Sequence, residues 1–464
     1  MKKPYILLTA ILGLSGLEVL GAYFAGYLTQ EKFKDNILKS KQMLVPGALE
    51  ILSYDRGLFS SEAKLSVEGF GNKETFLIHF LHGPIIFDKS STIPIQFKAA
   101  IARGQQEAFT MPINTLFVKT ALTAPMRWKI SVNYSGDLNY EMEGKAAKGQ
   151  ANDRFVESAG FKLTGKVNLS SNETQSHSEQ EMVFPEILVK KDEEATDYIS
   201  RHQNSKMTAN IDMIGKEDFK SDVLFSVQKI NGKMGVEWAA DDLKFAVNAF
   251  TLPQNVEAAL DINVHNLSFA ERSYGPLEMH FRFLDIDKAP ILSLQTKMLE
   301  LLKAGKIDPN LVSQDLILVL NQIFSKRPEV ILDKGLFILP EGQIDVTGKI
   351  ALGGEAFKGG SIDALLKTAE GALSLLIPKS AFRNLIAFFV EDEMTQDKQY
   401  EKMDFKAKME TLERKVDQYI ANLSNEKYLN ARLIKEKEDN YEIGIVYSKG
   451  RFLSEGKELK FRIK

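Results

Sequence analysis

The stretch Trp128-Lys-Ile-Ser-Val-Asn-Tyr-Ser-Gly-Asp-Leu-Asn-Tyr-Glu-Met-Glu143 alternates apolar and polar residues on both sides of a Ser-Gly-Asp turn. A period of two with one apolar side is typical of an antiparallel strand that has one solvated face. The stretch therefore predicts a β-hairpin formed by residues 128–134 and 138–143.

The same alternation recurs on both sides of this hairpin. The segments that carry it are 63–68, 161–169, 207–213, 223–227, 243–247, 256–264 and 277–283. Asn231-Gly232 is the dipeptide most typical of a tight hairpin turn, and it predicts a turn into the segment 234–238. Residues 54–289 are therefore predicted to form one antiparallel β-rich region.

From residue 290 onward the apolar period changes to that of helices. A helical face is predicted for Leu316–Phe324 after an Asp308-Pro309 start signal, and a second helix for 382–389. The longest helix is predicted from Asp404 to Ile434, with a heptad-like apolar stripe from Phe405 to Leu423. Packing of this stripe on the sheet is the commoner meaning, and dimerisation is the alternative.

These patterns predict an α+β protein that is mostly antiparallel β. The expected architecture is a large twisted or wrapped sheet, with amphipathic helices concentrated in the C-terminal third and one N-terminal transmembrane helix. The expected regions are a membrane anchor (1–29), a connector (30–53), the β-rich region (54–289) and a mixed region (290–464). The helices are too few to cover every strand, so the sheet folds on itself, wraps the helices or leaves an apolar groove.

The segment Tyr5–Leu28 carries a single charged residue, Glu18, and follows Lys2 and Lys3. Its length suits a membrane span, and the aromatic residues near its end make a poor signal-peptide cleavage site. Lys2 and Lys3 favour a cytoplasmic N-terminus. We therefore expect an uncleaved single-pass anchor, and the pattern assigns no role to Glu18.

Composition excludes several classes of function. The formal net charge is -3, so the basic excess expected of a nucleic-acid-binding protein is absent. There are no cysteines, which excludes thiol catalysis, disulfides and cysteine-ligated metals.

The sequence also lacks a recognisable catalytic or metal-binding motif. His79 and His82 would point to opposite faces of a strand, so they do not form a metal site. Ser61 and Lys64 match the S-x-x-K spacing, but on a strand they also face opposite ways. No catalytic, cofactor-binding or metal-ligating residue is predicted, and the protein is expected to be non-enzymatic.

A distinctive motif follows the anchor. It comprises Tyr54, Arg56, Gly57, Phe59, Ser60 and Ser61, followed later by His82, Gly83 and Pro84. Together with the N-terminal anchor, it resembles the YdgA-like family of bacterial proteins of unknown function. The resemblance implies an inner-membrane-anchored periplasmic protein and assigns no catalytic residue. From their residue types, we interpret the motif positions as architectural.

The sequence thus predicts a membrane-anchored periplasmic protein of the cell envelope with a binding or scaffolding role, for a lipid, another hydrophobe or an envelope protein. One alternative is an assembly partner, including a homo-oligomer, acting through the helix predicted at 404–434. Another is a hydrolase whose site is not recognisable from sequence.

Overall fold

The computed structural model describes residues 49–69, 72–82, 100–114, 119–133, 137–151, 154–169, 175–191, 198–214, 218–234, 236–269, 272–293, 321–354, 367–395, 403–425 and 431–459, and a few single residues and pairs between them. The chain divides into two compact units. Unit 1 comprises Met1–Lys233 with Leu292–Asp315, and unit 2 comprises Met234–Ile291 with Leu316–Lys464.

Unit 1 is an antiparallel meander. Its strands are β1 (Leu49–Arg56), β2 (Ser60–Gly69), β3 (Asn72–His82), β6 (Ala100–Asn114), β7 (Lys119–Val132), β8 (Leu138–Gly144), β11 (Phe161–Leu169), β12 (Gln175–Lys190), β13 (Tyr198–Ile214) and β14 (Asp218–Met234), each paired with the next. The hairpin of β9 (Ala147–Ala151) and β10 (Arg154–Ser158) pairs with the end of β12. β4 (Ile86–Phe87) and β5 (Ile95–Gln96) pair separately.

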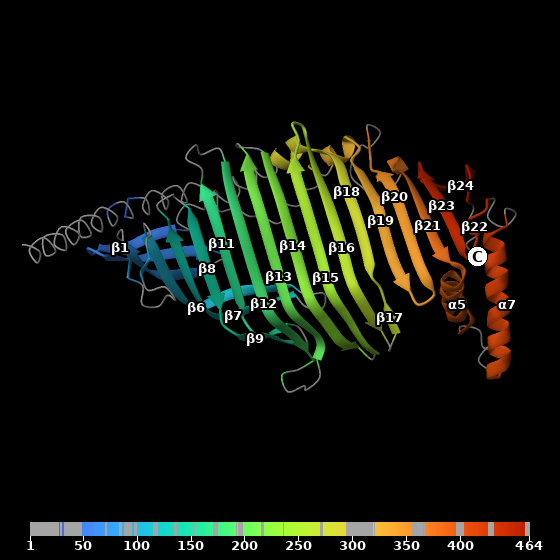
Figure 1. The fold of residues 1–464 in the computed structure, drawn as a ribbon, viewed down its shortest axis with the longest axis horizontal. Helices are drawn as coiled ribbons and strands as arrows, with labels where there is room; N and C mark the ends of the chain where they lie inside the picture. Colours follow the sequence, from blue (N-terminus) through green and yellow to red (C-terminus); the bar gives the residue numbers. More distant parts are fainter. Residues whose placement is uncertain are drawn as a thin grey trace, which may run out of the picture. The chain divides into compact units, whose positions relative to one another are not determined.

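Unit 2 continues the same architecture with helices added. The main strands are β15 (Val236–Thr251), β16 (Asn255–Phe269), β18 (Leu277–Asp287), β19 (Glu329–Leu339), β20 (Gly342–Ala351), β21 (Glu370–Pro378) and β23 (Asn440–Ser448), again paired in that order. The short strands are β17 (Arg272–Tyr274), β22 (Ile434–Lys437), β24 (Arg451–Ser454) and β25 (Lys457–Glu458). Figure 1 shows α5 (Lys379–Thr395) and α7 (Phe405–Leu423) beside β21–β23.

The predicted hairpin and the antiparallel class are confirmed. Trp128 pairs with Met142 and Val132 with Leu138, as the alternation requires. The predicted turn at Asn231-Gly232 is wrong. β14 runs through these residues, which pair with Arg201 and Ser200 of β13, and the Asn231 side chain donates a hydrogen bond to the Tyr198 hydroxyl. A neighbouring strand therefore overrides the local turn preference.

The longest predicted helix is shorter than expected. α7 begins after the N-cap Asp404, whose carboxylate accepts a hydrogen bond from the Ala407 amide at 2.8 Å. It ends at Leu423, and Ser424 caps it by donating its amide to the Ile420 carbonyl. Ile434, predicted as its last residue, instead begins β22.

Several predictions fall outside the described residues. They are the anchor Tyr5–Leu28 (except Tyr27), Gly83 and Pro84, and the helix start at Asp308-Pro309. Within the part of the chain that is described, no helix combines the length and hydropathy of a membrane span.

Each unit has its own buried cluster. In unit 1 it joins β7, β9, β10, β11 and β12, with Val156 and Val189 completely buried. In unit 2 it joins α5 and α7 to β21, β22 and β23. The helices contribute Phe382, Ile386 and Val416, which pack with Ile377 and Ile443 of the sheet.

The buried side of β13 changes at a left-handed residue, Asn204. Ser200 and His202 are buried before Asn204, whereas Ser205 and Ala209 are buried after it, so the alternation shifts by one position. Asn204 has a φ of 50°, a conformation that Asn tolerates better than most residues. The pairing of β13 with β12 and β14 stays in register across Asn204, so the buried side changes without an inserted residue.

Aromatic rings lie over glycines in unit 1. Trp128 is paired with Gly104, Phe161 with Gly144, and Tyr140 with Gly165. A Cβ on Gly165 would lie 2.2 Å from the Tyr140 ring, so the absent side chain makes room for the aromatic one. This packing flattens the rings against the sheet.

The Tyr140–Gly165 pair predicts a site-specific stability loss. Gly165→Ala forces the ring away and should destabilise the protein by about 1–3 kcal/mol, as overpacking does. The measurement is the midpoint of chemical denaturation of the full chain. Gly444→Ala is the control, because nothing lies within 4 Å of its added Cβ. Equal midpoints for the two variants would contradict the ring-over-glycine packing.

Candidate hydrophobic binding faces

One side of the unit 2 sheet is apolar from β15 to β23. Residues that are directly paired across strands project to the same side, so the pairing defines cross-strand rows. The first row is Phe245, Ile262, Met279, Gly335, Val346, Leu375 and Ile443; the second is Val247, Leu260, Phe281, Leu332, Gly348, Leu373 and Ile445; the third is Ala249, Ala258, Phe283, Val330, Ile350, Gly371 and Tyr447. The Tyr447 hydroxyl is the one polar side-chain group in these rows. We call them the unit 2 apolar face.

The helices pack on one end of this face. The helix cluster includes Leu375, Ile443 and Ile445 of the rows, and beyond the rows it reaches Leu339 of β19 and Ile344 of β20 on the same side. It includes none of the row members on β15–β19. Val247 remains 39% exposed and Leu373 42% exposed. With strands about 4.8 Å apart, the seven strands span roughly 30 Å. The described part of the chain thus presents an apolar surface wide enough for an extended hydrocarbon chain.

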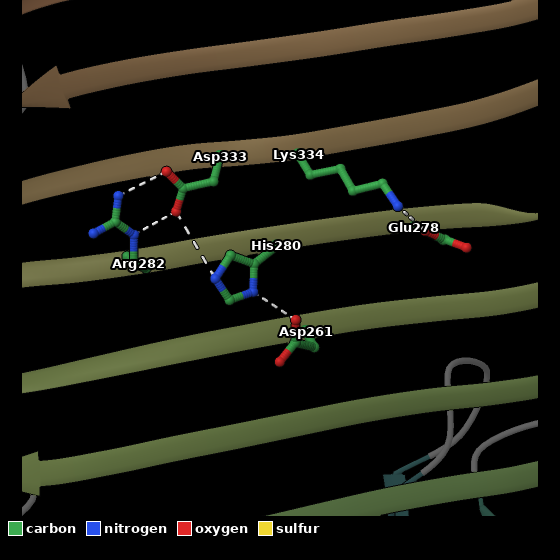
Figure 2. Close-up of polar contacts among 6 residues, drawn as sticks. All are labelled: Asp261, Glu278, His280, Arg282, Asp333 and Lys334. Atoms are coloured by element: carbon green, nitrogen blue, oxygen red, sulfur yellow. Dashed lines mark hydrogen bonds and ion pairs between the residues drawn. The ribbon is translucent and has the colours of Figure 1, made fainter.

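The opposite side of the unit 2 sheet carries many charged residues, together with apolar ones such as Ile331, Leu336 and Phe250. Figure 2 shows His280 between Asp261 and Asp333, with its Nδ1 2.6 Å from Asp261 Oδ1 and its Nε2 3.8 Å from Asp333 Oδ2. Asp333 also accepts hydrogen bonds from Arg282, one of them at 2.7 Å. The bonded guanidinium lowers the pKa of Asp333. Lys334 and Glu278 form a separate ion pair beside this network.

Unit 1 has a second face of the same kind. Its central row is Trp128, Met142, Leu163, Met182, Met207 and Phe225, across β7, β8, β11, β12, β13 and β14. Met207 and Phe225 are more than one-third exposed. Methionine side chains are flexible and polarisable, so they adapt to differently shaped apolar partners. We call this row and its neighbours the unit 1 apolar face.

The reverse side of unit 1 holds a polar hollow of about 660 Å³. Its charges are largely balanced: Glu141 pairs with Lys162 at 2.9 Å and Glu181 with Lys206 at 2.7 Å. Such a surface is typical of the solvated side of a sheet, and it does not single out one ligand chemistry.

The structure brings three residues of the N-terminal motif together. Ser61 of β2 and His82 of β3 are both buried, and Ser61 Oγ lies 2.9 Å from His82 Nε2. Tyr54 of β1 packs against the neighbouring cluster of Ala63, Ile78 and Phe80, with its ring 5.8 Å from that of Phe80. Burial raises the pKa of the Tyr54 phenol, and the nearby Ser61 hydroxyl and Arg56 guanidinium partly offset this increase. His79, by contrast, is exposed beside Glu62, as the alternation predicted.

The other motif residues lie at the β1–β2 turn. The Gly57 amide donates to the Ser60 carbonyl at 2.8 Å, which closes the turn. Arg56, Phe59 and Ser60 are exposed. The His82 amide donates to the Phe59 carbonyl at 3.0 Å, which ties the turn to β3.

The arrangement of Ser61 and His82 is structural in character. A nucleophilic serine needs access for a substrate, whereas both side chains here are at least 96% covered. Sequence reasoning treated the two as separate motif positions. Their meeting depends on the β2–β3 register, in which Ser61 pairs with Phe80, two residues before His82. Within the described residues, no group of three His, Asp or Glu side chains could hold a metal ion.

The fold defines an antiparallel β-sheet protein in which each of the two units has one apolar side. The chain belongs to a family of bacterial proteins of unknown function, DUF945, whose model matches residues 1–461. No curated protein and no solved structure matches the chain.

The buried hydroxyl–imidazole pair predicts a second stability effect. Ser61→Ala removes the partner of His82 Nε2 and should cost about 1–3 kcal/mol of unfolding free energy. Ser60→Ala is the matched control, because Ser60 is exposed on the same strand. Equal thermal midpoints for both variants would show that the hydrogen bond contributes nothing.

Two histidines of unit 1 predict opposite pH effects on stability. Burial lowers the pKa of His202 below its ordinary value of 6.5, so its contribution falls as the pH drops below 6.5. Hydrogen bonds to Asp212 and then Glu179 raise the pKa of His177, so its stabilisation is complete below 6.5 and is lost as the pH rises through the raised value.

Denaturation midpoints measured between pH 5 and pH 8 test these two opposite effects of pH on stability. His202→Gln should reduce the loss of stability on acidification, whereas His177→Gln should increase it. A change in the same direction for both variants would contradict the assignment.

Proposed function

We propose that the protein is a non-enzymatic binding protein for lipid acyl chains, anchored in the bacterial inner membrane by Tyr5–Leu28 with its body in the periplasm. The observation that carries the proposal is the unit 2 apolar face. Its rows contain almost no polar side-chain group, and several of its members stay partly exposed.

The chemistry of this face favours a hydrocarbon over a polypeptide. A bound peptide must satisfy its backbone amides and carbonyls. The face offers aliphatic and aromatic surface, and β16, β18, β19 and β20 are each paired on both edges, so a peptide cannot add to them as a strand. An acyl chain has no hydrogen-bonding groups that need partners on this face. Covering about 300 Å² of apolar surface would contribute roughly 7 kcal/mol before the entropy of binding is subtracted.

A pair of variants on β15 tests this proposal. Val247 on the apolar face is 39% exposed, and Phe250 on the opposite face is 40% exposed. Val247→Glu places a charge among the acyl chains and should reduce bound lipid at least tenfold, whereas Phe250→Glu should leave it unchanged. The measurement is mass spectrometry of lipids that co-purify with the full chain in mild detergent.

The absence of any bound lipid from the unmodified protein would refute the proposal. Equal lipid content in the two variants would also count against the unit 2 apolar face as the binding surface. Membrane orientation is tested separately with a C-terminal reporter, and a reporter that is active in the cytoplasm contradicts the periplasmic placement.

A second candidate function is assembly with another protein chain through α7. The apolar stripe of this helix is divided: Leu412 and Val416 pack inside unit 2, whereas Phe405 is 81% exposed and Met409 is also exposed. Phe405→Ser with Met409→Ser should then convert an oligomer to a monomer in light scattering of the detergent-solubilised chain. A monomer before substitution would exclude self-association by this route.

A further inference from the structure

One end of strands β19–β24 is rich in cations. Lys326 and Arg327 precede β19, Lys367 precedes β21, Lys449 lies in the β23–β24 turn, and Arg451 begins β24. All five side chains are exposed. We call this group the cationic end.

Several contacts hold these segments close to one another. Arg327 forms an ion pair with Glu370, and Glu370 is paired with Ser448 in the sheet, next to Lys449. The Cγ of Lys367 lies 3.9 Å from the position that a Cβ would take on Gly450. The five cations therefore belong to one end of the sheet.

The charge at this end is not balanced by the described carboxylates nearby. Arg327 is neutralised by Glu370, and Arg451 lies 3.7 Å from Glu458. Lys326, Lys367 and Lys449 form no ion pair within the described part of the chain. The adjoining end of β18 carries two carboxylates, Asp285 and Asp287, which hydrogen-bond to the neutral Asn255 side chain and Ala289 amide, so the positive charge is concentrated on the β19–β24 side.

The opposite end of the same strands has the reverse character. Its turns carry Glu341 between β19 and β20, and Glu438 with Asp439 between β22 and β23. Two lysines also lie at this end: Lys379 is paired with Glu436, and Lys437 adjoins Glu438, so the acidic groups are in excess. An anionic group is therefore attracted to one end of the strands and repelled from the other.

The cationic end adjoins the unit 2 apolar face. The third row of that face includes Val330, Ile350 and Tyr447. Each of them is one residue from the terminus of its strand at the cationic end. Tyr447 contacts Phe452 with ring centroids 5.0 Å apart, and Phe452 is exposed. Apolar surface thus continues up to the cations without an intervening acidic residue in this row.

We propose that the cationic end binds the phosphate of an anionic phospholipid whose acyl chains lie on the unit 2 apolar face. The inference rests on the proposed function and adds the class of lipid and its orientation. A phosphate group with no balancing ammonium complements three unpaired lysines, whereas the headgroup of a zwitterionic lipid brings its own cation. The acyl chains then extend along the strands away from the cationic end.

The test compares two lipids with identical chains and different headgroups. The full chain in mild detergent is exchanged with phosphatidylglycerol or phosphatidylcholine, and bound lipid is counted by native mass spectrometry. The unmodified protein should prefer phosphatidylglycerol at least tenfold, and the preference should shrink as salt is raised. The variant K326Q/K367Q/K449Q should lose the preference but still bind both lipids.

The matched control is K406Q/K415Q/K437Q, which removes the same charge from exposed lysines of α7 and β22 in the same unit. It should keep the preference for phosphatidylglycerol. Equal binding of both lipids by the unmodified protein overturns the headgroup assignment and leaves the proposed function intact. Binding of neither lipid refutes the proposed function itself. Competition by millimolar inorganic phosphate as effective as that by phosphatidylglycerol identifies a free-anion site and overturns the lipid assignment.

Discussion

The register of antiparallel pairing is the constraint on which the whole structure depends. Side chains alternate along each strand, so a cross-strand row keeps one character only if every pair in it is aligned. A slip of one residue between β18 and β19 would place Asp333 and Lys334 among Phe281 and Leu260, and would move Leu332 into the ion-pair network of His280. Burial on one side and ion pairing on the other therefore reinforce the same register.

Positions outside the ideal alternation are part of this constraint. Asn204 in β13, Asp242 in β15 and Asp285 in β18 all have positive φ. Small polar side chains tolerate this conformation, so the strand can bend or shift without glycine. The glycines are used instead where an opposite ring needs room, as at Gly104 and Gly165.

Much of this fold could be predicted from the sequence, because alternation is a local property. The 128–143 hairpin, the long β-rich region and the face of α5 are visible as periods of two or 3.6 residues. The course of β14 through Asn231-Gly232 could not be predicted from the sequence, because it depends on pairing with the neighbouring strand β13. The end of α7 was missed for a related reason: the predicted helix ran on to Ile434, which instead begins β22.

The candidate site was less predictable than the fold. Each row of the unit 2 apolar face takes residues from seven strands, and their alignment cannot be derived from any single segment. The meeting of Ser61 with His82 likewise depends on the β2–β3 pairing. The contrast between cationic and acidic strand ends becomes visible only when turns far apart in the sequence are placed side by side.

The methionines of the unit 1 apolar face link this surface to redox chemistry. Met207 and Met213 are exposed, and oxidants convert methionine to a polar, chiral sulfoxide. Two added oxygen atoms would thus give a hydrocarbon-like surface hydrogen-bond acceptors while the backbone pairing stays intact. Because methionine sulfoxide is reducible, such a change in the polarity of the face would be reversible.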